Sequence, residues 1–203
     1  MEPGSRRFGA EPAHISGHLG FLVLDGLLAR RVLIAQTRCT ELLGQGDVLR
    51  PWSMDAAEIS SVPVETDWQI VGRPARFAVL DAHFARHAAR WPQITSELLD
   101  RVVQRARWLS FQLAVCHTKR VHTRLLMVLW HFADRWGRVT PEGVVVDIGL
   151  VHETLAEIVA ARRPSVTTAL GELRREQRIR ALPGGAWLLL GDPPEMSPAL
   201  RVP

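Results

Sequence analysis

The amino-acid sequence predicts an α+β fold with an N-terminal antiparallel β domain, a long central helix, and a C-terminal helix-turn-helix followed by a hairpin. Three observations lead to this prediction. Short apolar runs separated by turn residues fill residues 18–90. No glycine or proline interrupts the chain between Pro92 and about His117. Apolar residues at helical spacing then precede a Pro-Gly-Gly turn in the C-terminal part.

The N-terminal half is expected to form an antiparallel β-roll or barrel of jelly-roll type. Asp25-Gly26 and Gly44–Asp47 are turn signals, and Asp81 is a candidate cap for a helix that runs through Phe84 towards Arg90. The strands expected around these turns are Phe21–Leu24, Leu27–Ile34, Glu41–Leu43, Val48-Leu49, Trp68–Val71 and Arg76–Leu80.

From Pro92 to about His117, apolar residues recur at steps of three, four and seven. A helix of roughly 25 residues spans nearly 40 Å, more than a small domain needs for its own core. The pattern therefore favours a coiled-coil-like seam with a second copy of the chain, and the alternative is a core helix of a single globular unit. The seam residues that we expect are Leu98, Val102, Leu109 and Leu113. Another helix is expected from Val121 to Trp136.

Two short helices joined by a tight turn are predicted between residues 152 and 175. The first has no good N-cap, because Val151 stands where Ser, Thr or Asp would cap. Pro164 suits the first turn of the second helix. Its expected buried stripe is Val166, Ala169, Leu170 and Leu173, which leaves arginine and hydroxyl side chains facing outward. Such side chains near a helix N-terminus can reach phosphates and base edges of DNA.

Strands are expected at Gly143–Ile148 and on both sides of Pro183–Gly185. Helix, strand, helix-turn-helix and hairpin is the element order of a winged helix. The alternative is a structural helical hairpin with solvated arginines. The candidate DNA-binding residues are Arg162, Arg163, Ser165, Thr167, Thr168, Arg174 and Lys119, and Arg120 and Arg124 could also touch phosphate.

Charge and composition narrow the function. The net charge of +4 equals the excess of six arginines over two glutamates between Arg162 and Arg180, which favours a polyanionic partner, although an ordinary charged helix face has the same pattern. Without a long apolar run or a secretory signal, we expect a cytoplasmic protein, in which Cys39 and Cys116 are small buried hydrophobes.

These residues together resemble the Crp/Fnr family of bacterial transcription regulators over about residues 18–191. The firmest part is Leu155–Val159 through Arg163–Thr167. The resemblance implies a cyclic-nucleotide-binding-like roll, a dimerisation helix, a winged helix, and a homodimer on a near-palindromic operator, with RNA polymerase as a further partner. The expected parts are a flexible N-terminus at 1–17, a shortened roll at 18–90, the dimerisation helix at 91–118 and the winged helix at 119–203.

The sequence departs from the family where a cyclic nucleotide would bind. No Gly-Glu pair follows Gly46-Asp47 in Trp52–Glu58, and Arg73–Arg76 lacks the hydroxyl partner of a phosphate-binding arginine. We therefore expect no cofactor and no cyclic AMP, with another effector or none. Arg163 falls where the family places a base-reading arginine, but Pro164 and Thr168 differ from the best-known pattern, which implies a different operator.

Two other classes of function compete with DNA binding. One is a ligand-sensing or protein-interaction module without specific DNA binding. The other is an enzyme, which the sequence does not favour: His83 and His87 lie four residues apart without the glutamate of a zinc protease, and no nucleophile-base motif or metal-ligand spacing appears. We therefore expect neither a catalytic residue nor a metal site.

Overall fold

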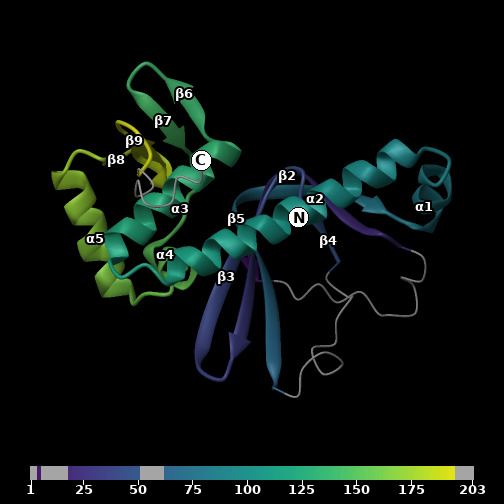
Figure 1. The fold of residues 1–203 in the computed structure, drawn as a ribbon, viewed down its shortest axis with the longest axis horizontal. Helices are drawn as coiled ribbons and strands as arrows, with labels where there is room; N and C mark the ends of the chain where they lie inside the picture. The colour runs from purple at the N-terminus through teal and green to yellow at the C-terminus, as the bar shows by residue number, and fades with distance from the viewer. Residues whose placement is uncertain (1–3, 6–17, 51–61, 195–203) are drawn as a thin grey trace, which may run out of the picture. The chain divides into compact units, whose positions relative to one another are not determined.

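The computed structural model describes residues 4–5, 18–50 and 62–194 and divides the chain into two compact units, residues 1–110 and 111–203 (Figure 1). The first unit holds β1 (Gly4–Ser5), β2 (Gly20–Ile34), β3 (Thr37–Leu43), β4 (Val48–Leu49), β5 (Val64–Leu80), α1 (Ala82–Ala88) and most of α2 (Pro92–Cys116). The second holds the end of α2, α3 (Val121–Trp136), β6 (Arg138–Thr140), β7 (Gly143–Val146), α4 (His152–Ile158), α5 (Arg163–Arg175), β8 (Ile179–Ala181), a 3₁₀ turn (Pro183–Gly185) and β9 (Trp187–Leu189). The expected α+β fold class is confirmed.

An antiparallel sheet forms the first unit, with strand order β1-β5-β2-β3 and β4 paired to β2. Its buried core is Val23, Leu28, Leu43, Leu49, Trp68, Ile70 and Ala75. The expected turn at Gly44–Asp47 is present, with the buried Asp47 carboxylate accepting from the Gly44 amide at 2.7 Å. Asp81 caps α1 by accepting from the Phe84 amide at 2.7 Å, and this bond lowers the pKa of its carboxyl.

Two sequence expectations for the sheet are wrong. Asp25-Gly26 is not a hairpin turn but an irregularity inside β2, and the strands expected at Trp68–Val71 and Arg76–Leu80 are one continuous strand, β5. Residues 72–75 of β5 stand opposite Gly26, where both strands change register. Gly26 has φ +87°, and a Cβ there would lie 2.7 Å from the Ala75 Cα. The turn residues therefore mark a bulge rather than a chain reversal.

The second unit is a winged helix. Its sheet has the order β6-β7-β9-β8, and β8 and β9 pair on either side of Pro183–Gly185 as expected. The expected strand at Gly143–Ile148 ends at Val146, and β6 was not foreseen. The expected helix Val121–Trp136 is confirmed, and its Leu125, Leu129 and Phe132 are fully buried.

The two cysteines differ in their surroundings. Cys39 of β3 is exposed, so the expectation that it is a buried hydrophobe is wrong. Cys116, the last residue of α2, is half-buried with its Sγ 3.7 Å from the Ile158 carbonyl, and burial raises the pKa of its thiol. Cys116, which is half-buried, therefore comes closer than Cys39 to the small buried hydrophobe that was expected of both.

His131 on α3 stacks on Phe111 with ring centroids 5.2 Å apart. Burial, aided by the nearby Arg135 charge, lowers the pKa of His131 from 6.5 to about 4. Between these pH values the unfolded chain binds a proton that the folded chain does not, so the stability is lost as pH falls towards 4. We expect the melting temperature to drop over this range, and less steeply in His131→Asn. Thermal unfolding against pH measures both slopes. Equal slopes in the unchanged protein and in His131→Asn would contradict the pKa shift of His131. The matched control is His117→Asn, because His117 is exposed.

Candidate nucleic-acid interface

The helix α5 has one buried and one exposed face, as its spacing predicted. Val166, Ala169, Leu170 and Leu173 are each at most 3% exposed. They pack in the core with the fully buried Leu155 and Ile158 of α4. The opposite face of α5 is thereby held outward by the core.

The exposed face gathers most of the predicted DNA-binding residues on the first turns of α5. Pro164 lies in the first turn of the helix, as expected. Proline is tolerated there because the amide hydrogens of the first turn have no acceptor within the helix. Arg162 precedes the helix with an extended backbone and makes no side-chain cap. The exposed side chains at this end are Arg162, Arg163, Ser165, Thr167 and Thr168. We call this set the α5 N-terminal face.

Two hydroxyls of the α5 N-terminal face bond back to the helix. Thr167 Oγ1 donates to the Arg163 carbonyl and Thr168 Oγ1 donates to the Pro164 carbonyl, each at 3.1 Å. The Thr167 hydroxyl also lies 3.0 Å from Nδ1 of His152, the first residue of α4. Each hydroxyl hydrogen is therefore directed at a helix carbonyl, so these side chains present an acceptor oxygen and a methyl group rather than a free O–H donor. His152 was not predicted as part of the site, and no local sequence signal pairs it with Thr167.

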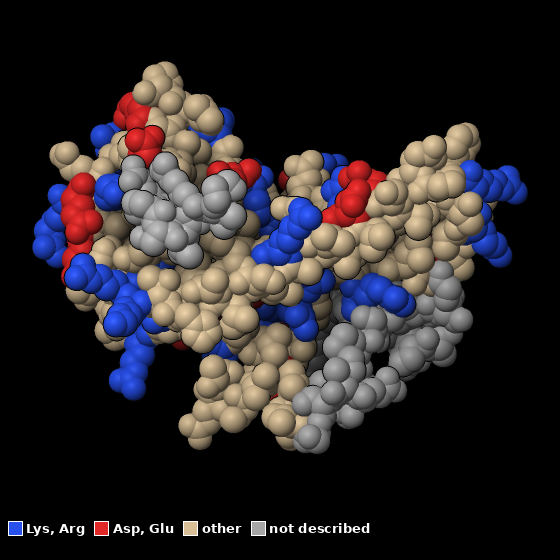
Figure 2. Space-filling view, in the orientation of Figure 1, with Lys and Arg blue, Asp and Glu red and all other residues tan. Residues whose placement is uncertain are grey.

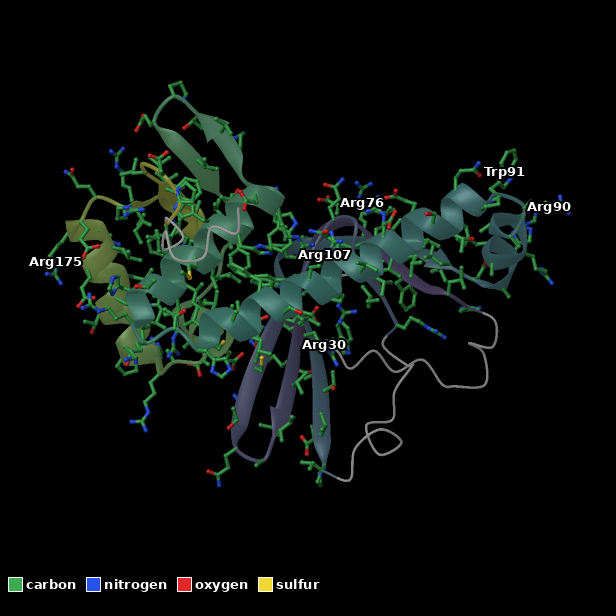
Figure 3. All side chains as sticks on the ribbon, viewed as in Figure 1. Arg30, Arg76, Arg90, Trp91, Arg107 and Arg175 are labelled. Carbon is green, nitrogen blue, oxygen red and sulfur yellow. The ribbon has the colours of Figure 1, made fainter. Side chains whose placement is uncertain are left out.

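The two remaining candidates lie apart from the α5 N-terminal face. Lys119 is exposed in the link between α2 and α3. Arg174 lies in the last turn of α5, about 16 Å along the helix axis from Arg163. Its guanidinium stacks over the Trp187 ring of β9 at 5.1 Å, so it connects the helix to the wing. Arg175 follows it and projects outward from α5 (Figure 3).

Arg124 differs from the expectation that it could touch phosphate. Its Nε donates to the Thr118 carbonyl at 2.5 Å, and its Nη1 donates to the Val159 and Ala160 carbonyls at 3.0 Å each. These bonds join the start of α3 to the turn of the helix-turn-helix. Arg124 therefore positions the motif.

The turn between α4 and α5 has a left-handed residue without a glycine. Ala160 has φ +49°, and the Ala161 amide donates to the Ala156 carbonyl at 2.9 Å, which closes α4 in the manner of a Schellman motif. The weak start expected for α4 is also present, because Val151 makes no side-chain cap. With weak signals at both ends, α4 depends on its packing and on Arg124.

The charge of this unit is basic on the α5 side. Figure 2 shows Lys and Arg side chains gathered around α5, with acidic side chains beside them. Glu172 of α5 is partly exposed, and its carboxylate lies 4.0 Å from Nδ1 of His122. The α5 N-terminal face itself carries two arginines and no acidic residue. An exposed, positively charged helix end with hydroxyl acceptors has the chemistry that duplex DNA recognition requires.

The long helix α2 has its own exposed stripe. Leu99, Val102, Leu109 and Leu113 are 61, 50, 40 and 63% exposed, and the small Ala106 falls between them on the same stripe. These five residues follow a strict alternation of four and three, the repeat of a coiled-coil seam. Leu98, included in the expected seam, is half-buried in its own chain, and Leu99 lies in the repeat instead. Trp108, Gln112 and Val115 form the buried face of α2.

Comparison with known proteins also indicates a helix-turn-helix domain of the DNA-binding type. Residues 120–197 match the Crp-like helix-turn-helix domain. The global nitrogen regulator of Synechococcus elongatus is 25% identical over 88 residues, which are 43% of this chain and 40% of that relative. A transcriptional regulator of the CRP family from Thermus thermophilus superposes with a TM-score of 0.63 at 20% identity, over 94% of this chain and 90% of that one. FixK2 from Bradyrhizobium japonicum has a TM-score of 0.67 at 13% identity, with 93% and 88% covered.

Fold and site together define a protein with a C-terminal winged helix-turn-helix domain and an N-terminal antiparallel roll. Residues 120–197 carry a Crp-like helix-turn-helix domain, and the chain shares the fold of a solved CRP-family regulator, in line with the family that the sequence resembles. In the described residues, no helix is long and apolar enough to cross a membrane.

Proposed function

We propose that this protein is a homodimeric, sequence-specific DNA-binding regulator that acts in the cytoplasm on a near-palindromic operator. The observation that carries the proposal is the α5 N-terminal face, where arginines and hydroxyls are exposed on a helix whose other face is buried. In this proposal Arg163 reads a base edge, and Lys119 and Arg162 contact phosphate. The protein acts by binding, without catalysis, and RNA polymerase is a further partner.

The homodimer part of the proposal is supported by the exposed seam of α2. Four large apolar side chains lie exposed along one stripe of this 25-residue helix, and their exposure to water is unfavourable. A second copy of the chain would cover them. Two α5 helices related by a two-fold axis would then meet successive major grooves about 34 Å apart. The operator would accordingly carry two related half-sites.

The effector part of the proposal is that the roll responds to a ligand other than cyclic AMP, or to none. Arg76 belongs to the basic cluster that was considered for binding the phosphate of a cyclic nucleotide. Its side chain is exposed, and its guanidinium lies 3.8 Å from the Asp25 carboxylate. The stretch Trp52–Glu58, which lacks the Gly-Glu pair, lies outside the described residues. Calorimetric titration with cyclic AMP tests this part directly, and micromolar binding would contradict it.

The whole proposal is tested by selecting bound duplexes from a random library, with and without cell extract. A two-fold consensus supports DNA reading, and a change with extract reveals an effector. The competing hypothesis, an interaction module without specific DNA binding, predicts no consensus. It also predicts that the protein lacks the salt-dependent affinity for duplex DNA that phosphate contacts produce.

Arg163→Ala is expected to lower affinity for the selected duplex by about 1–3 kcal/mol, or roughly 5- to 150-fold, if Arg163 makes a two-bond contact to a guanine. Fluorescence anisotropy measures the loss, which should shrink on a duplex with that base changed. Arg86→Ala, which removes an exposed arginine of α1, is the matched control and should leave affinity unchanged. Full affinity in Arg163→Ala would remove this residue from the reading face.

A further inference from the structure

A buried carboxylate of the roll lies between arginines from two elements. Glu41 of β3 has a side chain only 4% exposed. Its Oε1 accepts from Arg105 Nε at 2.6 Å and its Oε2 from Arg105 Nη2 at 2.8 Å. On the other side, Arg30 Nη1 of β2 lies 3.4 Å from the same Oε2. Arg30 is labelled in Figure 3. One carboxylate therefore joins α2 to two strands of the sheet.

The next turn of α2 contacts the Gly44–Asp47 turn. Arg101 Nη1 donates to the Gly46 carbonyl at 2.9 Å, and Arg101 Nη2 pairs with Glu97 at 2.7 Å. Gly46 has φ +88°, a left-handed backbone angle that favours glycine at this turn. Arg105 Nη1 also lies 3.5 Å from the Val48 carbonyl. Polar contacts thus hold α2 on the roll over two helical turns.

The Glu41 contacts have the chemistry of an anion site. A guanidinium presents parallel N–H groups that match a carboxylate or phosphate with two bonds, and Arg105 does so here. Burial lowers the pKa of Arg105, but the Glu41 hydrogen bonds and charge outweigh it and raise that pKa, so the guanidinium stays charged. The site is therefore a pair of cations around one carboxylate that the chain itself supplies.

We propose that Glu41 is a built-in ligand: its carboxylate fills an anion site made by Arg30 and Arg105 and holds α2 on the roll without a soluble effector. This inference rests on the proposed function, because α2 carries the seam on which two-site DNA binding depends. It implies that the ligand-free protein is already competent to bind its operator. It also implies that removing the carboxylate leaves a site for small carboxylates.

The test replaces Glu41 with alanine and adds acetate, which matches the missing part of the side chain. Glu41→Ala should lose about 5- to 150-fold in affinity for the selected duplex, the usual range of coupling between sites. Acetate at constant ionic strength should restore binding, and neutral acetamide should not. Glu41→Ala/Arg105→Leu should not respond to acetate. Glu65→Ala, which removes an exposed carboxylate of β5, should bind as the unchanged protein does.

A second readout separates this inference from DNA binding. Acetate should raise the melting temperature of Glu41→Ala, whether or not the protein binds any duplex. Acetate stabilisation without duplex binding by the unchanged chain would leave the site standing and contradict the proposed function. Unaltered affinity in Glu41→Ala, or equal effects of acetate and acetamide, would overturn the inference. If Glu41→Ala does not fold, Glu41→Gln keeps the shape without the charge, and full affinity in it would likewise overturn the inference.

Discussion

Arg124→Met will destabilise the winged helix by about 2–3 kcal/mol, the cost of losing hydrogen bonds from a charged donor. The methionine keeps most of the apolar volume but leaves the carbonyls of Thr118, Val159 and Ala160 without the Arg124 donor. The half-buried position of Arg124 limits replacement by water. Denaturant unfolding of the full chain, followed by tryptophan fluorescence, measures the loss.

The same variant should also bind DNA more weakly than its residual stability alone explains. Val159 and Ala160 form the turn that leads into α5, and the Arg124 bonds fix that turn. Arg120→Met is the matched control for stability, because Arg120 is exposed at the start of α3, and it should change the free energy of unfolding by no more than about 0.5 kcal/mol. An Arg124→Met protein as stable as this control would show that the three carbonyls are satisfied by other means.

Arg124 also shows where sequence reasoning ends. The sequence predicted a basic residue near a helix start and assigned it to phosphate, because a local pattern does not reveal carbonyls 35 and 36 residues away. Local periodicity did predict α2, α3 and the two faces of α5, because burial of a helix follows its own spacing. The pairs His152–Thr167 and Glu41–Arg105 were missed for the same reason, because their members lie 15 and 64 residues apart in the chain.

The error at Asp25-Gly26 has a different physical origin. Glycine after aspartate is a good hairpin signal because it allows a positive φ, and Gly26 does have one. The same backbone angle also serves a bulge, where a strand bends around a close neighbour, here Ala75. Whether the chain reverses depends on the partner strand, and β5 lies far along the chain from this position. Local turn chemistry could therefore locate the irregularity without identifying its kind.

In the proposed homodimer, Leu109→Asp with Leu113→Asp will separate the two copies and lower the affinity for a two-half-site operator by about 10²- to 10⁴-fold, the usual gain from linking two binding modules. Both leucines are exposed in the single chain, so the charges should not disturb its own core. In a dimer they would place four carboxylates along one seam, where desolvation and like-charge repulsion oppose association. Sedimentation velocity measures the oligomeric state, and anisotropy measures affinity for the full operator and for a half-site.

The half-site is the informative comparison. If the seam acts only by joining two winged helices, the double variant should bind an isolated half-site as well as one winged helix of the unchanged protein does. The matched control is Gln104→Asp with Arg107→Asp, two exposed positions of α2 outside the seam, with Arg107 visible in Figure 3. This control should remain dimeric and keep its operator affinity. A double variant that stays dimeric would show that the exposed stripe of α2 is not the interface.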